Sequence, residues 1–197
     1  MRGLLFCLGF ALLLAGCQTP PAPEDNFYRL LPVEVAPRLP AAIREAGLTV
    51  KPLRADSLYG ERAVLYTEAD QPRRLRQYHY HLWLYPPGQL IQEQLAASLR
   101  RSNPDSPIRW GERAEGSGYA VSGRVLRFER VVSRDGSQAV AELELTLETA
   151  GHDVLLRKTY GAEVAAPQGG MNGFGQAMEQ ALARIYGEFA GDLQRLK

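Results

Sequence analysis

The stretch AVAELELTLET, residues 139–149, alternates apolar and polar side chains along its length. Successive side chains of a β-strand point to opposite sides of the sheet, so this period of two predicts a strand with one face on a core and the other toward water. The predicted core face carries Ala139, Ala141, Leu143, Leu145 and Leu147, and the predicted water face carries Glu142, Glu144, Thr146 and Glu148.

Two further long strands flank this one. Asp135-Gly136 precedes it and predicts a hairpin, because glycine readily adopts the positive φ that such turns need. Residues 119–132 on the other side of that turn have the composition of a long strand, and Gly151-His152-Asp153 separates residues 139–149 from a third strand at 154–164. The three segments predict an antiparallel meander.

Two amphipathic helices are expected to cover this sheet. The C-terminal one has apolar residues every three or four positions, namely Phe174, Met178, Ala181, Leu182, Ile185, Phe189, Leu193 and Leu196. Residues 169–175 are rich in glycine and are predicted to be a loop that leads into it. The other helix, residues 89–101, has Leu90, Ile91, Leu95 and Leu99 on one face and ends before Pro104.

Shorter elements fill the first half of the chain. We expect strands at residues 27–31, 48–53, 63–67, 78–85 and 108–110, and a helical turn at residues 41–46. The whole pattern predicts an α/β fold: a single domain, residues 27–197, with a mixed, largely antiparallel sheet packed by two main amphipathic helices.

Residues 1–16 have the order of a secretory signal, with Arg2, then an apolar run to Leu14, then Ala15 and Gly16. The run is shorter than the roughly 20 residues that cross a bilayer. Cys17 follows directly, and a thiol at this place is the nucleophile that accepts a diacylglyceryl group. We therefore predict a lipidated Cys17 at the mature N-terminus; the alternative is a plain secretion signal with an accidental cysteine.

Residues 17–26 are polar and rich in proline, which predicts an extended tether with a reach of about 30 Å. Two or three acyl chains on Cys17 would make attachment to a membrane effectively permanent. Gln18, by resemblance to other lipoproteins of Gram-negative bacteria, predicts sorting to the outer membrane. Cys7 leaves with the signal, so no thiol remains to form a disulfide.

Charge argues against nucleic acid as a partner. The chain has 23 Lys plus Arg and 22 Asp plus Glu. Removal of Arg2 with the signal leaves equal numbers of basic and acidic residues in the mature protein, so no positive excess remains to bind phosphates. Three arginines cluster within residues 73–76, which we interpret as a solvated loop; contact with anionic lipid headgroups or an acidic partner is the alternative.

Catalytic motifs are weak, and we predict no catalytic residues, metal or cofactor. His79 and His81 lie two apart on a strand and would be two zinc ligands, but no spacing marks a third, and semi-exposed sheet residues are the simpler interpretation. The chain lacks Gly-x-Ser-x-Gly, and its glycine stretch lacks the Gly-Lys-Ser/Thr of a phosphate loop. The aromatic stripe Tyr78, Tyr80, Trp83 and Tyr85 either fills a core or binds a partner or lipid tails.

Several short motifs occur in an order that is typical of one protein family. They are Cys17 with its proline tether, FYRL at residues 27–30, YHYHLW at 78–83, Pro86-Pro87 before a helix, YAVSG at 119–123, Phe128 and the closing helix. In this order the chain resembles the ABC-type transport auxiliary lipoprotein family, which includes PqiC-like intermembrane transport lipoproteins.

The resemblance implies a non-enzymatic α/β domain similar to the N-terminal domain of TolB. It also implies a role in lipid transport between the two membranes, with an inner-membrane ABC permease and ATPase and an MCE-type periplasmic protein as partners, and ring assembly in some members. We expect a partner near Trp83, Pro86 and Pro87. Alternatives are an anchored hydrolase that uses His79 and His81, and a structural lipoprotein that binds peptidoglycan or an outer-membrane assembly partner.

Overall fold

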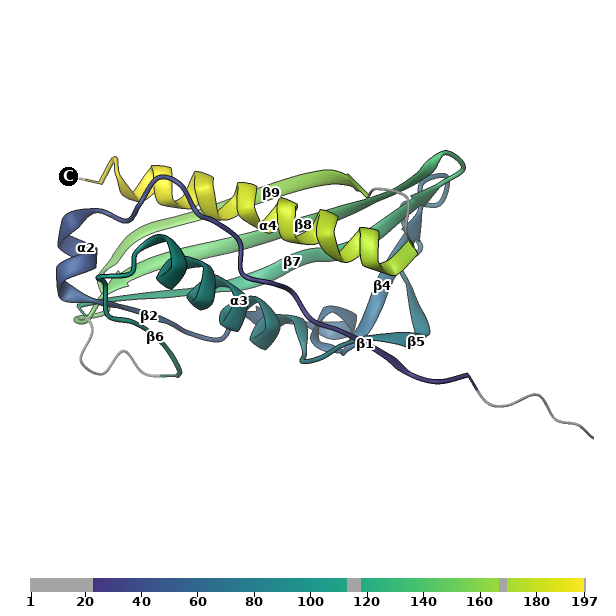
Figure 1. The fold of residues 1–197 in the computed structure, drawn as a ribbon, viewed down its shortest axis with the longest axis horizontal. Helices are drawn as coiled ribbons and strands as arrows, with labels where there is room; N and C mark the ends of the chain where they lie inside the picture. The colour runs from purple at the N-terminus through teal and green to yellow at the C-terminus, as the bar shows by residue number, and fades with distance from the viewer. Residues whose placement is uncertain (1–22, 113–117, 167–169, 197) are drawn as a thin grey trace, which may run out of the picture.

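A computed structural model describes residues 23–112, 118–166 and 170–196. They form one nine-stranded mixed sheet with helices packed on one of its faces (Figure 1). The predicted signal, Cys17 and the first part of the tether lie outside the described residues. The predicted α/β fold class, with its mixed sheet and two main helices, is confirmed.

The predicted antiparallel meander is present and forms the largest part of the sheet. It consists of β7 (Tyr119–Ser133), β8 (Gly136–Thr149) and β9 (Val154–Ala166). All five residues predicted for the core face of β8 are buried. The other face is less open than predicted, because Val140 and Thr146 on it are buried as well.

The second edge of β7 pairs with three short parallel strands that follow one another along it. These are β2 (Leu48–Val50), β3 (Arg54–Ala55) and β4 (Ala63–Glu68). The predicted single strand at residues 48–53 is therefore wrong in extent. Pro52 has no N–H to donate to a ladder, and the strand is interrupted there.

Three more strands lie outside these. β6 (Ile108–Trp110) pairs with β2 in parallel, β5 (Arg76–Trp83) pairs with β4 antiparallel, and β1 (Asn26–Tyr28) pairs with β5 in parallel. The predicted strand at residues 27–31 ends early, at Tyr28. The 3₁₀ turn η1 (Ser57–Gly60) joins β3 to β4, and the short helix α2 (Ala41–Ala46) precedes β2.

Two long helices cover the sheet: α3 (Pro87–Ser102) packs near β2, β3 and β6, and α4 (Gly170–Leu193) packs on β8 and β9. The predicted loop at residues 169–175 is wrong from Gly170 onward, because α4 begins there. Glycine in a helix costs about 1 kcal/mol relative to alanine, but burial of Phe174 favours continuing the helix through this stretch.

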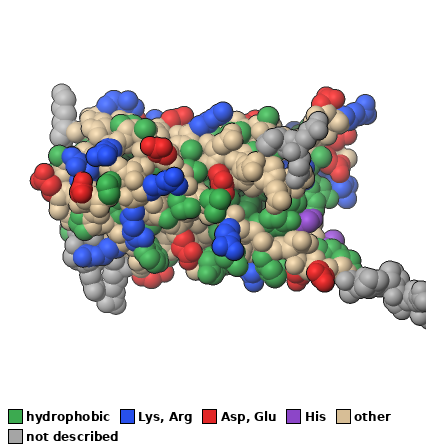
Figure 2. Space-filling view, viewed as in Figure 1, with side chains coloured by type: hydrophobic (Ala, Val, Ile, Leu, Met, Phe, Trp, Pro, Cys, Tyr) green, Lys and Arg blue, Asp and Glu red, His purple; other side chains and the backbone are tan. Residues whose placement is uncertain are grey.

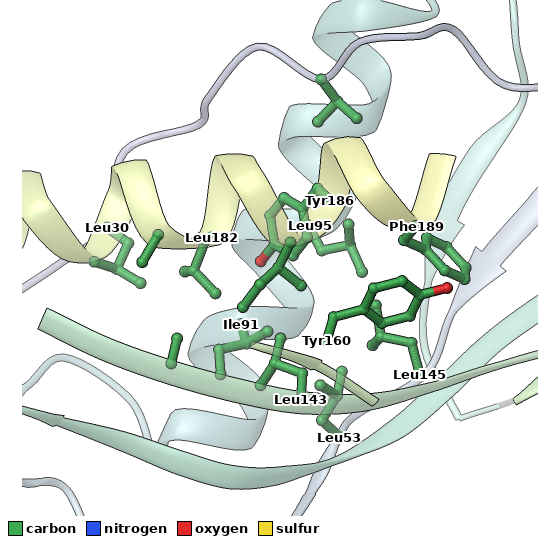
Figure 3. Close-up of a cluster of buried hydrophobic side chains, with 14 of the residues drawn as sticks. Leu30, Leu53, Ile91, Leu95, Leu143, Leu145, Tyr160, Leu182, Tyr186 and Phe189 are labelled. Atoms are coloured by element: carbon green, nitrogen blue, oxygen red, sulfur yellow. The ribbon is translucent and has the colours of Figure 1, made fainter. Parts of the chain in front are cut away.

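The core lies between the sheet and the two helices. Figure 3 shows side chains of β8 and β9, such as Leu143 and Tyr160, facing Leu182 and Phe189 of α4 and Leu95 of α3. At the start of α3 the helix is pressed against the sheet, since a Cβ on Gly88 would lie 2.0 Å from the Leu53 carbonyl oxygen.

Between β1 and α2 the chain runs over both helices, and we call residues 29–40 the N-terminal strap (Figure 1). Its backbone is bound by side chains of α3. Gln94 Nε2 donates to the Leu31 carbonyl at 3.1 Å, and the hydroxyls of Ser98 and Ser102 accept from the next alternate N–H groups, of Val33 and Val35, at 3.0 and 2.8 Å.

We call these bonds from Gln94, Ser98 and Ser102 to the strap the side-chain ladder. It forms because the spacing of side chains along one helix face matches the spacing of alternate residues along an extended chain. Side chains four apart on a helix rise by about 6 Å on one face, and alternate residues of an extended chain advance by about 6.6 Å. At the end of the ladder, Asn103 Oδ1 accepts from the Leu39 N–H at 3.0 Å. From α4, a Glu179 carboxylate oxygen accepts from the Leu31 N–H at 2.7 Å. The strap thus joins α3 and α4.

Candidate interaction surface

Two of the three residues predicted to meet a partner lie inside the fold. The Trp83 ring is 1% exposed and packs against the rings of Phe128 and Phe174, with centroid distances of 5.1 and 5.9 Å. Pro87 is buried in the first turn of α3, where its missing N–H costs no helical bond. The side chains of Trp83 and Pro87 therefore cannot form the predicted docking surface, and only Pro86 is exposed.

Four large apolar side chains beside Trp83 do face solvent, and we call them the β1–β5 patch. The exposed fraction is 52% for Phe27, 43% for Tyr80, 38% for Leu84 and 37% for Tyr85. Phe27 is the middle residue of β1, and the other three lie in β5 or directly after it. Neighbouring exposed apolar side chains of this kind are typical of an interaction surface.

Pairing of β1 with β5 brings these residues together. Asn26 is opposite His81 in the parallel register, and its side-chain amide donates to the Tyr80 carbonyl at 3.3 Å. Past the end of β5, the Leu84 N–H donates to the Tyr28 carbonyl at 2.7 Å. The patch is therefore built on hydrogen-bonded backbone.

One arginine borders the patch. The Arg62 guanidinium lies over the Phe27 ring, 5.1 Å from its centroid, and Arg62 Nε donates to the Trp83 carbonyl at 3.1 Å. The second bond fixes the side chain across the edge of the sheet. Phe27 thus presents one ring face to a cation and leaves half of its surface to solvent.

The aromatic stripe predicted at residues 78–85 has two environments. Trp83 fills the core, whereas Tyr80 and Tyr85 are exposed. Tyr78 is half-buried and stacks on Tyr66, with 4.5 Å between centroids. The core interpretation therefore holds for Trp83, and binding of a partner or of lipid tails by the exposed tyrosines stays a prediction.

The two histidines have separate surroundings. His81 Nδ1 is 2.9 Å from the Tyr28 hydroxyl, and its ring meets the Tyr78 ring edge to face at 5.4 Å. Tyr78 and His81 would lie on opposite faces of a regular strand, but the register of β5 against β4 is shifted here. His79 is exposed. Within the described ranges, no group of three or more histidine, cysteine or carboxylate side chains is placed to hold a metal.

The arginine cluster at residues 73–76 lies at and after the turn between β4 and β5. Arg73 and Arg74 are exposed, as a solvated loop predicts, and Arg74 Nη1 donates to Gln71 Oε1 at 3.4 Å. Arg76 is in an ion pair with Glu68 at 2.8 Å. Figure 2 shows acidic and basic side chains interspersed over the visible face, with no large region of one sign.

A family model described as the ABC-type transport auxiliary lipoprotein component matches residues 28–190. The chain belongs to this family. The match begins inside β1 and ends inside α4, so it spans both helices and the whole sheet apart from the first residues of β1. The resemblance predicted from the order of short motifs is confirmed.

Solved structures share the fold. Protein XCC0632 from Xanthomonas campestris is 18% identical with a TM-score of 0.68, and the alignment covers 87% of this chain and 100% of that one. An uncharacterized protein is also 18% identical, with a TM-score of 0.66 over 87% of this chain and 99% of its own. Comparison with curated proteins gave no match.

Membership makes this an auxiliary transport component of a lipoprotein family. Within residues 23–112, 118–166 and 170–196, no helix is both long and apolar enough to cross a bilayer.

Sequence reasoning missed Phe27 and Leu84 as surface residues. A pattern that indicates Leu84 is present in the segment YHYHLWLYPP, residues 78–87, where apolar residues occupy consecutive positions after residue 81. In a strand such a run places apolar side chains on both faces. One face here meets the core through Trp83, so Leu82 and Leu84 must point the other way.

Proposed function

We propose that this protein is an outer-membrane-anchored periplasmic lipoprotein that serves as a non-catalytic auxiliary subunit of an ABC/MCE-type intermembrane lipid transport system. The family match over residues 28–190 supports the transport role most directly. The signal pattern that ends at Cys17, and Gln18 after it, support an acylated N-terminus and export to the outer membrane.

The distribution of polar groups supports a non-catalytic role. Within the described part of the chain, the buried Gln92 of α3 donates through Nε2 to the Val50 carbonyl at 2.9 Å, and buried Asn103, directly after α3, bonds to the strap. The buried Glu129 carboxylate is bound by Arg127 at 2.6 Å and by the Tyr59 hydroxyl at 2.5 Å. These groups are used to hold the fold together.

The expected partners are an MCE-type periplasmic protein and, through it, the inner-membrane permease and ATPase. The balanced charge of the mature chain favours a protein or lipid partner over nucleic acid. An anchored adaptor gains affinity without new contacts, because the tether holds it at a high local concentration beside any partner at the same membrane.

Co-purification tests this proposal. The affinity-tagged lipoprotein is extracted from native envelopes with a mild detergent, and its companions are identified by mass spectrometry. We expect recovery of an MCE-type protein or a permease component, and loss of both membrane attachment and recovery in Cys17→Ser, which has no thiol to acylate. Recovery of no transporter component from the wild-type protein would contradict the proposal.

A separate measurement addresses the hydrolase alternative. We expect no stoichiometric zinc in the purified domain and no change in metal content in the double variant His79→Ala, His81→Ala. Zinc that is lost on these substitutions would favour an enzyme.

A further inference from the structure

Exposed apolar side chains gather at the end of the molecule where the N-terminal segment leaves the fold. Figure 2 shows hydrophobic and histidine side chains beside that point, and Figure 1 places β1 and β5 there. The β1–β5 patch supplies Phe27, Tyr80, Leu84 and Tyr85, three of which are aromatic. Tyrosine favours the boundary between lipid and water, where its ring is buried and its hydroxyl is hydrated. Exposed phenylalanine and leucine bury their side chains at the same depth in proteins that lie on a membrane.

The tether fixes how far this end is from the bilayer. Whatever its conformation, the chain from Cys17 to Asn26 spans at most about 30 Å. The long axis of the domain is greater, because β7 (Tyr119–Ser133) alone extends about 50 Å. An anchored molecule therefore keeps the β1 end near the lipid, whereas the end that carries α2 and β6 is held away unless the domain lies flat.

From these observations we propose that the β1–β5 patch is a membrane-contact surface, which inserts into the interfacial region of the bilayer that holds the anchor. The inference rests on the proposed acylation of Cys17. A single attachment through the tether would leave the domain free to rotate. A second contact, through the patch, gives it one orientation, with Trp110 of β6 and Leu155 of β9 directed away from that membrane.

The β1–β5 patch is proposed to bind the bilayer through apolar contact, not through charge. Exposed Arg29 and Arg62 lie beside the patch, but exposed Glu24, Asp25 and Glu61 lie in the same segments and outnumber them. The local charge therefore does not favour anionic lipid, and binding is expected on zwitterionic bilayers as well. This distinguishes the patch from a basic surface of the kind suggested by the arginines at residues 73–76.

The test uses the full lipidated protein reconstituted in phosphatidylcholine vesicles. With Cys7 removed and Cys17 acylated, one introduced cysteine is the only free thiol, so Tyr80→Cys and Leu84→Cys each carry a single fluorophore. Leu155→Cys is the matched control, because Leu155 is exposed to the same extent as Tyr80, at 43%. A nitroxide quencher on the lipid chains is expected to quench the labels at 80 and 84 and to leave the label at 155 bright.

A charge substitution in the patch strengthens the test. Phe27→Asp together with Tyr85→Asp should abolish quenching of the label at 84, whereas Leu155→Asp should leave it unchanged. These side chains are exposed, so the fold is expected to persist, which circular dichroism checks. Vesicle flotation should be the same for all variants, since the acyl chains carry the attachment.

The outcomes separate the two proposals. Wild-type protein that fails to float with vesicles overturns acylation and with it the proposed anchor. Protein that floats, but whose labels at 80 and 84 are not quenched, overturns the membrane-contact surface alone. Quenching that appears only when phosphatidylglycerol is added overturns it too, because charge would then drive the contact. Labels shielded from aqueous iodide but untouched by lipid quencher would indicate that a protein or a second copy covers the patch.

Discussion

Helices α3 and α4 lie on the same face of the sheet and are held there in different ways. α4 is attached mainly through apolar residues, including Phe174, Leu182 and Phe189, all of which are buried. α3 also buries Ile91 and Leu95, but it adds a polar stripe that binds the backbone of the N-terminal strap. Both helices therefore close the core directly, and α3 in addition holds the strap.

The difference shows what each helix depends on. Loss of an apolar group from α4 leaves a cavity in the core, and the cost grows with its volume. Loss of a polar group from α3 leaves a partly buried strap N–H or carbonyl without its partner, and the cost is that of the desolvated group. Four substitutions test this contrast, ordered from the largest expected effect to the smallest.

Phe189→Ala should have the largest effect. The ring is buried and meets Tyr160 edge to face, with 5.8 Å between centroids. We expect a loss of about 3–5 kcal/mol in the free energy of unfolding, measured by urea denaturation. The exposed neighbour Glu188→Ala is the control and should change stability by less than about 0.5 kcal/mol. Equal values for the two would contradict the apolar attachment of α4.

Asn103→Ala tests the strap. Its side chain accepts from the Leu39 N–H at 3.0 Å and donates to the Leu99 carbonyl at 2.9 Å, and both bonds are buried. We expect a loss of about 2 kcal/mol, together with faster hydrogen exchange at Leu39 and its neighbours in the strap. Exposed Arg101→Ala serves as the control. Unchanged exchange in the strap would mean that the ladder does not hold it.

Asp192→Asn tests a polar cluster at the end of α4. The carboxylate accepts from Lys158 and from the Tyr160 hydroxyl, both at 2.8 Å, and is paired with Arg195. These bonds lower the pKa of Asp192 to about 2. Because the folded-state pKa is lowered, this stabilisation is present above about pH 4 and is lost as the pH falls toward 2.

At neutral pH we expect Asp192→Asn to lose about 1 kcal/mol, since two of the three partners are largely exposed and are screened by solvent. As the pH falls from about 4 to 2 the difference between the variant and the wild-type protein should shrink, and the two should converge at about pH 2 and below. A stability difference that does not depend on pH in this range would contradict the charge-based account.

Tyr186→Phe should have the smallest effect, and of opposite sign. The Tyr186 hydroxyl is buried with no hydrogen-bond partner among the described residues, and burial raises its pKa well above the ordinary value. Removing an unsatisfied polar atom is expected to be neutral or to stabilise by up to about 1 kcal/mol in thermal unfolding. A marked destabilisation would reveal a partner for this hydroxyl.

The same contrast explains how much was predictable from the sequence. The apolar spacing of α4 and the alternation in β8 follow from burial on one face, and both were predicted. Gln94 and Ser98 were not identified, because a polar residue that binds a strap and one that faces water look alike in a periodicity. The strap contacts α3 from a distance of more than 60 residues in the chain, and no local signal marks that pairing.

The candidate surface was predicted only in part for a related reason. The apolar character of residues 78–87 indicated that part of this segment is buried. Which of its side chains are buried, such as Trp83, and which are exposed, such as Tyr80, depends on the face of the sheet that α4 covers. The shift of register in β5 also moves His81 toward Tyr78, which regular alternation cannot predict. The lipidation of Cys17 stays a prediction, because residues 1–22 lie outside the described part of the chain.

The strap also has a mechanical consequence. A pull on the anchor enters the domain through β1 and then follows the strap, which runs alongside α3 in the same direction (Figure 1). Bonds at Leu31, Val33 and Val35 lie across this line, so tension loads them together in shear and does not peel them off one at a time. The attachment point is thus reinforced against the force that a moving membrane or a working transporter would exert on it.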